Sequence, residues 1–327
     1  MNDSIVGLAI EAKGLVKVFG NNRVVDGVDL AIPKGSVYGF LGHNGAGKTT
    51  TIRMLSTLLP MDGGTVKVFG YDLAMEPHEV RGQISLAGQY ASLDEDLTGY
   101  ENLVMIARLV GYSRKRAKMR AQELLRVFGL EEAAKRQVKT YSGGMRRRID
   151  IAGSIVVTPR ILFLDEPTTG LDPQSRNQVW EIVRALASVG TTVLLTTQYL
   201  EEADRLADRI AVMKQGRIIA EGTSNELKSS VGSRTLHIRL VHEEESERAK
   251  AMLSDKVASP VRSSSDPCEL FVQVTDPMLV AEGLRSLGNA NISIREHSYG
   301  QPSLDEVFLT LTRRSSVEQS GVEEGVQ

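Results

Sequence analysis

The first part of the chain alternates apolar and polar side chains as β-strands do. Segments 8–19 and 24–32 follow a period of two, and 37–41 is a short apolar run that leads into a glycine-rich turn. The pattern then predicts a helix over 49–58 and a return to strand over 65–73. A sheet-rich N-terminal region interrupted by one helix is therefore expected.

The pattern changes to a helical period in the next part of the chain. Residues 98–140 and 142–157 carry apolar side chains at helical spacing. Thr98 and Glu101 have the spacing of a capping box, and Ser113 precedes a strongly basic helix. These features predict a run of helices inserted between strands.

After residue 160 the pattern alternates between strands and helices. The segment 161–166 is apolar without interruption until its last two residues, which indicates a parallel strand buried on both faces. Strands that alternate with helices imply a mainly parallel sheet covered by helices on both faces. The expected strands are 161–166, 191–197, 209–214 and 217–222, and the expected helices are 173–188 and 200–207.

A second domain is indicated by a change of composition at 228–233, where small polar residues gather. The patterns that follow give the order β-α-β-β-α-β, which is the ferredoxin-like arrangement. Ser303 and Glu306 have capping spacing before a final helix over 307–314. The segments in order are 234–241, 244–256, 256–262, 269–274, 276–288 and 291–299.

The predicted organisation is an α/β domain over 8–228 and a small α+β domain over 234–314. A helical subdomain is expected over about 92–158. Residues 315–327 are Ser, Glu, Gly and Val without periodicity, so we expect a disordered tail there.

Composition narrows the class of protein. The 327 residues suffice for two domains, and a net charge of −2 gives no tendency towards nucleic acid. The single cysteine, Cys268, cannot form an internal disulfide, which fits a reducing compartment. The N-terminus does not have the form of a signal peptide, and no run of about 18 apolar residues predicts a membrane span.

The turn after 37–41 matches the P-loop pattern, in the strand–helix context that the motif requires. In such a loop glycines let backbone N–H groups point at phosphate oxygens, and the helix N-terminus favours an anion. Lys48 is expected to reach the β- and γ-phosphates, and the Thr49 hydroxyl to hold Mg²⁺. The alternative is a glycine-rich turn without a ligand. The expected nucleotide-binding residues of this segment are Gly42, Asn44, Gly45, Ala46, Gly47, Lys48, Thr49 and Thr50.

Two carboxylates end the apolar strand 161–166. Asp165 stands where a Mg²⁺-holding aspartate is expected. The two-residue period places Glu166 on the opposite side of the strand, but at the strand's end it can still turn towards a water and act as general base. The alternative is a buried strand that ends in acids where it meets solvent.

The sequence Ser142-Gly143-Gly144-Met145 precedes the helix predicted over 142–157. Ser142 is a good N-cap, and the glycines permit close approach of an anion to free N–H groups. This would be a second anion site in a chain with one P-loop. The alternative is an ordinary helix cap.

Together these motifs resemble the nucleotide-binding subunit of ABC transporters. The P-loop, the Ser-Gly-Gly signature, the segment LFLDEPTTGLD and a loop with Gln89 occur in that order, over about residues 8–228. The resemblance implies two subunits that face head to tail, with ATP between one P-loop and the other subunit's signature. It also implies that Phe19 stacks on adenine, that Gln89 senses Mg²⁺ and the membrane partner, and that Asp172 crosses the dimer interface. The γ-phosphate would be bound in trans by Ser142, Gly143 and Gly144.

The sequence departs from the general ABC pattern at two positions. Met145 stands where glutamine is usual in the signature. Gln198 stands where the family usually has a histidine that contacts the γ-phosphate. A glutamine amide can donate a hydrogen bond to phosphate but cannot carry a charge. We therefore expect catalysis by Lys48, Glu166 and Gln198 without a positively charged switch.

A narrower resemblance covers nearly the whole chain. TYSGGMRRRIDIA, LLTTQYLEEAD and SLDEVFLTLT resemble the daunorubicin-resistance type of ATP-binding subunit from actinobacterial drug exporters. This implies a homodimer on the cytoplasmic face of the cell membrane, which touches the membrane only through a separate integral permease. It implies ATP and Mg²⁺ as cofactors and a hydrophobic antibiotic or lipid-like cargo.

Two basic stretches permit two interpretations each. The cluster after Ser113 either contacts anionic lipid or is a solvated helix face. Arg146, Arg147 and Arg148 either steer nucleotide or are surface charge. The first cluster comprises Arg114, Lys115, Arg116, Lys118 and Arg120.

Other functions remain as alternatives. A soluble ATPase of this superfamily that acts on nucleic acid usually carries long coiled coils between its motifs, and no sustained heptads occur here. Relatives that act on the ribosome carry two cassettes, whereas this chain has one P-loop. An importer ATPase is the third alternative, and the C-terminal module argues mildly against it.

Overall fold

The computed structural model divides the chain into two compact units, Met1–Ser224 and Asn225–Gln327. The chain is described over residues 7–88, 93–231, 234–257, 259–264, 266–274, 276–300, 303–308 and 310. The 315–327 segment, which we expect to be a disordered tail, lies outside the described residues.

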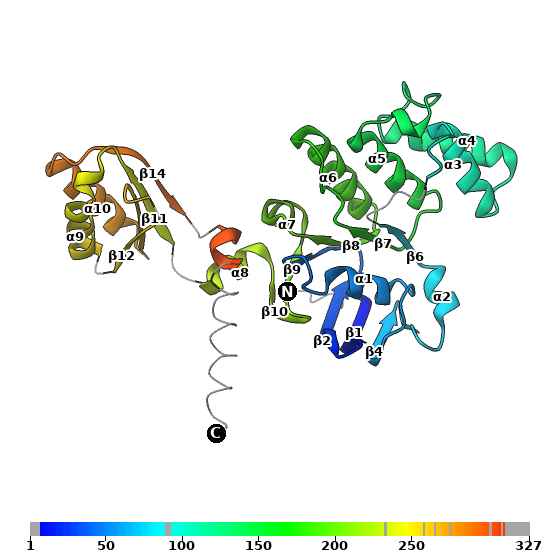
Figure 1. The fold of residues 1–327 in the computed structure, drawn as a ribbon, viewed down its shortest axis with the longest axis horizontal. Coiled ribbons are helices and arrows are strands. Elements are labelled where there is room, and N and C mark those ends of the chain that lie inside the picture. The colour runs from blue at the N-terminus through cyan, green and yellow to red at the C-terminus, as the bar shows by residue number, and fades with distance from the viewer. Residues whose placement is uncertain are drawn as a thin grey trace. The chain divides into compact units, whose positions relative to one another are not determined.

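Two sheets form the base of the N-terminal unit (Figure 1). The first is antiparallel with strand order β2-β1-β4-β5, and the second has the order β10-β9-β3-β8-β7-β6. Strands β9, β3, β8, β7 and β6 are parallel, and β10 joins that edge antiparallel. The strands are β1 (Leu8–Phe19), β2 (Asn22–Pro33), β3 (Val37–Leu41), β4 (Gly63–Val68), β5 (Tyr71–Asp72), β6 (Ile84–Ala87), β7 (Ile161–Asp165), β8 (Thr192–Thr197), β9 (Arg209–Lys214) and β10 (Arg217–Gly222).

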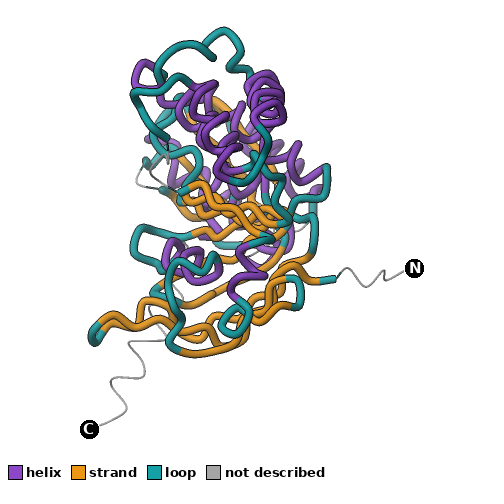
Figure 2. The backbone as a smooth tube through the Cα atoms, turned by 90° about the vertical axis from the view of Figure 1, so that its right-hand side faces the viewer, coloured by secondary structure: helices purple, strands orange, loops and turns teal. Residues whose placement is uncertain are grey.

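The helices of this unit include a separate helical group, which lies at the end of the unit opposite the β1–β2–β4 sheet (Figures 1 and 2). Its main members α3, α4 and α5 pack on one another. The capping box of Thr98 and Glu101 is present at the start of α3, and Ser113 caps α4. The helices are α1 (Lys48–Leu55), α2 (Pro77–Arg81), α3 (Gly99–Leu109), α4 (Arg114–Val127), α5 (Gly143–Ser154), α6 (Pro173–Ser188) and α7 (Leu200–Leu206), with a short 3-10 turn at Val138–Thr140.

The parallel sheet is buried on both faces, as the apolar run at β7 predicts. Leu162 and Leu164 of β7 join the core beneath the helical group. Ile161 and Phe163 join the other core, which includes side chains of β1, β2 and α1. Because alternate residues of one strand fill two cores, the carboxyl ends of the parallel strands emerge at one fixed edge.

The C-terminal unit has a four-stranded antiparallel sheet in the order β12-β13-β11-β14, with a core shared by α9 and α10. The order of elements along the chain is β-α-β-β-α-β, as the sequence pattern indicates. Ser303 Oγ accepts a hydrogen bond from Glu306 N at 3.2 Å. The elements are α8 (Ser224–Val231), β11 (Thr235–Leu240), a 3-10 turn (Glu243–Glu245), α9 (Ser246–Val257), β12 (Val261–Ser263), β13 (Glu269–Gln273), α10 (Pro277–Asn289) and β14 (Ile294–Gly300).

Helix α2 and strand β6 have no counterpart among the elements predicted from sequence. The strand is only four residues long, and Ser85 interrupts its apolar side chains, so the sequence shows no clear strand pattern there. Pairing with β7 defines it, from Ile84 against Ile161 to Ala87 against Leu164. Within the described residues, none of the helices combines the length and apolar character needed to cross a membrane.

Candidate functional site

The P-loop lies where strand β3 passes into helix α1. Strand β3 is flanked by β8 and β9, so the loop emerges in the middle of the parallel sheet. Gly47 has φ 103°, and a Cβ there would lie 2.6 Å from the carbonyl oxygen of Val24, so only glycine fits. The first N–H groups of α1 have no partner within the helix and point out of its N-terminus, where an anion would be bound.

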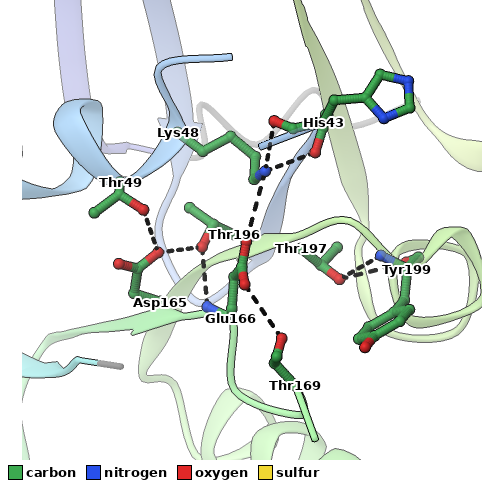
Figure 3. A network of polar contacts seen from close by, with 10 residues as sticks. His43, Lys48, Thr49, Asp165, Glu166, Thr169, Thr196, Thr197 and Tyr199 are labelled. Atoms are coloured by element: carbon green, nitrogen blue, oxygen red, sulfur yellow. Dashed lines mark hydrogen bonds and ion pairs between the residues drawn. The ribbon is translucent and has the colours of Figure 1, made fainter. Parts of the chain in front are cut away.

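Lys48 lies at the first position of α1 and is only 4% exposed. Its Nζ donates hydrogen bonds to the carbonyl oxygens of Gly42 at 2.6 Å and His43 at 3.1 Å. His43 offers only its carbonyl here, and its ring points away (Figure 3). Burial lowers the pKa of Lys48, and the carboxylates of Glu166 and Asp165 partly offset this.

Asp165 ends β7, and its carboxylate points at the first turn of α1 (Figure 3). Oδ1 accepts hydrogen bonds from Thr49 Oγ1 at 3.0 Å and from Thr196 Oγ1 at 2.6 Å. A hydroxyl and a carboxylate side by side are the hard oxygen ligands that Mg²⁺ prefers, and Mg²⁺ usually takes only one or two from the protein. These residues therefore fit the metal that the sequence implies.

Glu166 follows Asp165 and reaches the same site. Its backbone has φ 46°, in the left-handed region that few non-glycine residues adopt. Glu166 N is held by Thr196 Oγ1 at 3.0 Å, while its Oε2 accepts from Thr169 Oγ1 at 3.2 Å. Its Oε1 lies 3.7 Å from Lys48 Nζ (Figure 3). The regular strand ends at Asp165, so the alternation of side chains does not turn Glu166 away from the site.

A cavity of about 240 Å³ surrounds the P-loop. Glu166 lies at its wall, and the described residues that line it include none of Ser142, Gly143 or Gly144. Phe19 ends β1 and is 49% exposed, so its ring is accessible for stacking. The lining residues are Val24, Asn44, Gly45, Ala46, Gly47, Lys48, Thr49, Thr50 and Glu166.

The Ser-Gly-Gly motif caps helix α5, and Ser142 Oγ accepts from Met145 N at 3.3 Å. Ser142 and Gly143 are exposed, whereas Gly144 is buried. A Cβ on Gly144 would lie 2.2 Å from Ser175 Oγ. Ser175 in turn donates to Asp172, which caps α6. Asp172 is thus tied to the signature helix within this chain.

Gln198 and Gln89 follow the ends of two further parallel strands. Gln198 lies in the bend directly after β8, where Thr197 O accepts from Gly42 N at 3.3 Å. This brings Gln198 next to the start of the P-loop. Among the described residues its side-chain amide has no hydrogen-bond partner. Gln89, expected at the metal and at the membrane partner, lies outside the described residues.

Two charged residues near this site are buried: Glu202, which sequence reasoning missed, and Arg147, for which it left two interpretations. Glu202 of α7 accepts from Thr168 Oγ1 at 2.8 Å and Trp180 Nε1 at 3.0 Å. Burial raises the pKa of Glu202. Arg147 of α5 is buried against the ends of β6 and β7. The surface-charge interpretation is therefore wrong for Arg147. The signal available for Glu202 was its place on the same helix face as the apolar residues Ala203 and Leu206.

Comparison with known proteins agrees with this geometry. The family model for ABC transporters matches residues 25–169. The daunorubicin/doxorubicin resistance ATP-binding protein of Streptomyces peucetius is 59% identical over 95% of this chain and 94% of its own length. The linearmycin resistance ATP-binding protein of Bacillus subtilis is 36% identical over 94% of this chain and 99% of its own length.

A solved structure of the ATP-binding subunit of an ABC transporter superposes with a TM-score of 0.61 and 30% identity, covering 68% of this chain and 92% of that one. The matched motifs, the parallel sheet and the nearly full-length relatives lead to one identification. The chain belongs to the ABC transporter family as an ATP-binding, ATP-hydrolysing protein of the daunorubicin-resistance type.

Proposed function

We propose that this ATPase drives export of a hydrophobic antibiotic or a lipid-like compound through a separate membrane permease. The observation that carries the proposal is the 59% identity to a daunorubicin/doxorubicin resistance ATP-binding protein over 95% of the chain. Among more distant relatives the names change to linearmycin resistance and Nod factor export. These names differ in the compound but all refer to drug resistance or to export, so a class of cargo is proposed rather than one drug.

The proposed catalytic unit is a homodimer with composite ATP sites. The described wall of the P-loop cavity includes no signature residue, and Ser142 and Gly143 are exposed at the start of α5. A helix N-terminus with exposed glycine is suited to bind phosphate from another molecule. A dimeric ATP-binding cassette bound to ADP and Pi has the same fold, with a TM-score of 0.60 and 24% identity. In the dimer, Ser142 and Gly143 of one subunit would complete the P-loop site of the other.

Each site residue has its own proposed role in ATP binding or hydrolysis. Lys48 and the N–H groups at the start of α1 would hold the phosphates, and ATP supplies the phosphoryl group. Thr49 and Asp165 would hold Mg²⁺, and Phe19 would stack on the base. Glu166 would accept the proton of the attacking water, because its carboxylate lies at the cavity wall. The following residues would contribute further: Gln198 a hydrogen bond to the γ-phosphate, Gln89 a contact to the metal, and Asp172 a contact across the dimer interface.

In this proposal the protein is peripheral, on the cytoplasmic face of the membrane, and meets the bilayer through the permease. The test is co-expression with candidate permeases, followed by co-purification and uptake of a fluorescent anthracycline into inverted membrane vesicles. We expect ATP-dependent accumulation of the drug with the wild-type chain and none with Lys48→Ala. A chain that binds no permease, and whose ATPase activity responds to ribosomes or nucleic acid instead, would support the soluble alternative.

A further inference from the structure

Arg147 lies one turn after the signature in helix α5, and its side chain is only 10% exposed. Its guanidinium donates to backbone carbonyls of other elements. Nη1 reaches Gly88 O at 2.6 Å, Nε reaches Pro167 O at 3.0 Å, and Nη2 reaches Asp165 O at 3.3 Å. A fourth contact, to Ala87 O, is 3.5 Å long, and Asp150 Oδ2 lies 3.2 Å from Nη1.

The carbonyls that Arg147 contacts belong to two neighbouring strand ends. Ala87 ends β6, and Gly88 follows it and precedes Gln89 in the sequence. Asp165 and Pro167 flank Glu166 at the end of β7. One side chain therefore joins the signature helix to the segment of the hydrolytic carboxylate and to the segment that leads to Gln89.

The chemistry of the side chain suits this task. A guanidinium presents five N–H donors in a rigid plane, so it can contact several carbonyls at once and fix their relative positions. A buried charge that loses such partners is costly, which resists any separation of the helix from the strand ends. Burial disfavours the charge and lowers the pKa of Arg147, and the carboxylates of Asp150 and Asp165 partly offset this.

We propose that Arg147 is a positioning residue for ATP hydrolysis, which holds the helix of Ser142–Gly144 against the strand ends at Gly88 and Glu166. The inference rests on the proposed composite sites. It adds that one subunit's signature cannot move independently of that subunit's own Glu166. Loss of Arg147 should thus disturb both ATP sites of a dimer, one through Glu166 and the other through the signature.

Arg148 provides a matched control on the same helix. Its Nη1 donates to Phe128 O at 2.9 Å and Gly129 O at 3.4 Å, both inside the helical group. Arg147→Gln should lower kcat at least about tenfold, with ATP affinity of the monomer changed less than about twofold. Arg147→Lys should recover part of kcat, because a lysine keeps the charge but contacts fewer carbonyls. Arg148→Gln should keep kcat within about twofold. Equal kcat for Arg147→Gln and Arg148→Gln, or for Arg147→Lys and Arg147→Gln, would overturn the proposal.

Mixed dimers test two effects of Arg147 separately: its effect on Glu166 of the same subunit and its effect on the signature that completes the other subunit's site. In a mixture of Lys48→Ala with Arg147→Gln, the working site combines the P-loop and Glu166 of the Arg147→Gln subunit with the intact signature of the Lys48→Ala subunit. In a mixture of Gly143→Asp with Arg147→Gln, the working site combines the P-loop and Glu166 of the Gly143→Asp subunit with the signature of the Arg147→Gln subunit. A Cβ at Gly143 meets only Leu171 Cδ2 at 3.6 Å, so Gly143→Asp should fold.

The reference for both mixtures is Lys48→Ala with Gly143→Asp, which retains Arg147 in each subunit. After subtraction of each variant's own activity, we expect both Arg147→Gln mixtures to hydrolyse ATP at least about tenfold more slowly than the reference. Reference-level activity in either mixture would show that Arg147 does not link the two sites. An inactive reference mixture would instead contradict the composite sites themselves, and the homodimer kcat values would then decide the role of Arg147.

Discussion

Glu166 Oε1 lies 3.7 Å from Lys48 Nζ, although the carboxylate of the preceding Asp165 points at the same site. Adjacent residues of a regular strand point to opposite faces. The left-handed backbone at Glu166, with φ 46°, turns its side chain back to the P-loop. Such a conformation costs about 1–3 kcal/mol, and hydrogen bonds from Glu166 N to Thr196 hold it. The strain thus brings the proposed metal ligand, Asp165, and the proposed general base, Glu166, together from consecutive positions.

The first prediction separates these roles. Glu166→Gln should keep ATP binding and slow hydrolysis about 10²-fold or more, because an amide cannot accept the proton of water. Lys48→Ala should instead abolish tight binding, since it removes the cation that faces the phosphates. Equilibrium binding and steady-state hydrolysis, measured on both variants, distinguish them. Wild-type turnover by Glu166→Gln would remove Glu166 as the base.

The second prediction concerns Gln198, which lies directly after β8 beside the P-loop. Gln198→Ala should bind ATP almost normally and hydrolyse it roughly 10- to 150-fold more slowly, if a hydrogen bond of about 1.5–3 kcal/mol acts in the transition state. Gln198→His should stay active and gain a titration near pH 6.5, the usual histidine value, because imidazole can replace the amide donor. Turnover against pH for the three proteins is the measurement. An unchanged rate in Gln198→Ala together with an unchanged pH profile in Gln198→His would exclude a catalytic role.

The third prediction concerns the buried Glu202. Burial raises its pKa above the ordinary 4.5, so the folded chain keeps a proton that the unfolded chain releases. The free energy of unfolding should therefore fall as pH rises from about 4.5 towards the folded pKa. A one-unit difference in pKa between the two states corresponds to about 1.4 kcal/mol. Glu202→Gln cannot ionise and keeps an acceptor for Thr168 and Trp180, so it should gain stability relative to wild type as pH rises.

Urea unfolding of wild type and Glu202→Gln between pH 5 and 8 checks this. The quantity to follow is the difference between the two free energies of unfolding at each pH, since other titrating groups cancel in it. A difference that stays constant or decreases with rising pH would contradict the raised pKa. Glu201→Gln is the control, because Glu201 lies on the same helix and is exposed.

The fourth prediction concerns the C-terminal unit, which begins at Asn225. A chain that ends at Val231 should fold and bind ATP, because the P-loop, the signature and both carboxylates precede it. The unit has its own core, and we expect its loss to weaken pairing with a second subunit or with the permease. Sedimentation and permease pull-down, with and without residues 232–327, measure the effect. Equal assembly of both chains would mean that the unit only stabilises the fold.

Much of the site could be predicted because its parts are local. The P-loop needs only a strand, a turn with glycine at the strained position Gly47, and a helix, all within residues 37–55. The capping box of Thr98 and Glu101 and the cap at Ser142 are likewise set by short-range hydrogen bonds. Helix α6 spans the predicted 173–188, since Asp172 caps it and Pro173 opens it.

Other features depend on residues far apart in sequence. Strand β6 is defined by pairing with β7, about 77 positions later, and its four residues make too short a pattern to be found alone. Arg147 is one of three successive arginines for which the sequence allows either a role in steering nucleotide or surface charge, but the approach of α5 to β6 and β7 buries it among carbonyls. The sequence by itself determined the motifs and their chemistry. Only the tertiary structure decided which motifs lie together at the strand ends. Sheet order and the left-handed turn at Glu166 depend on contacts that no local pattern encodes.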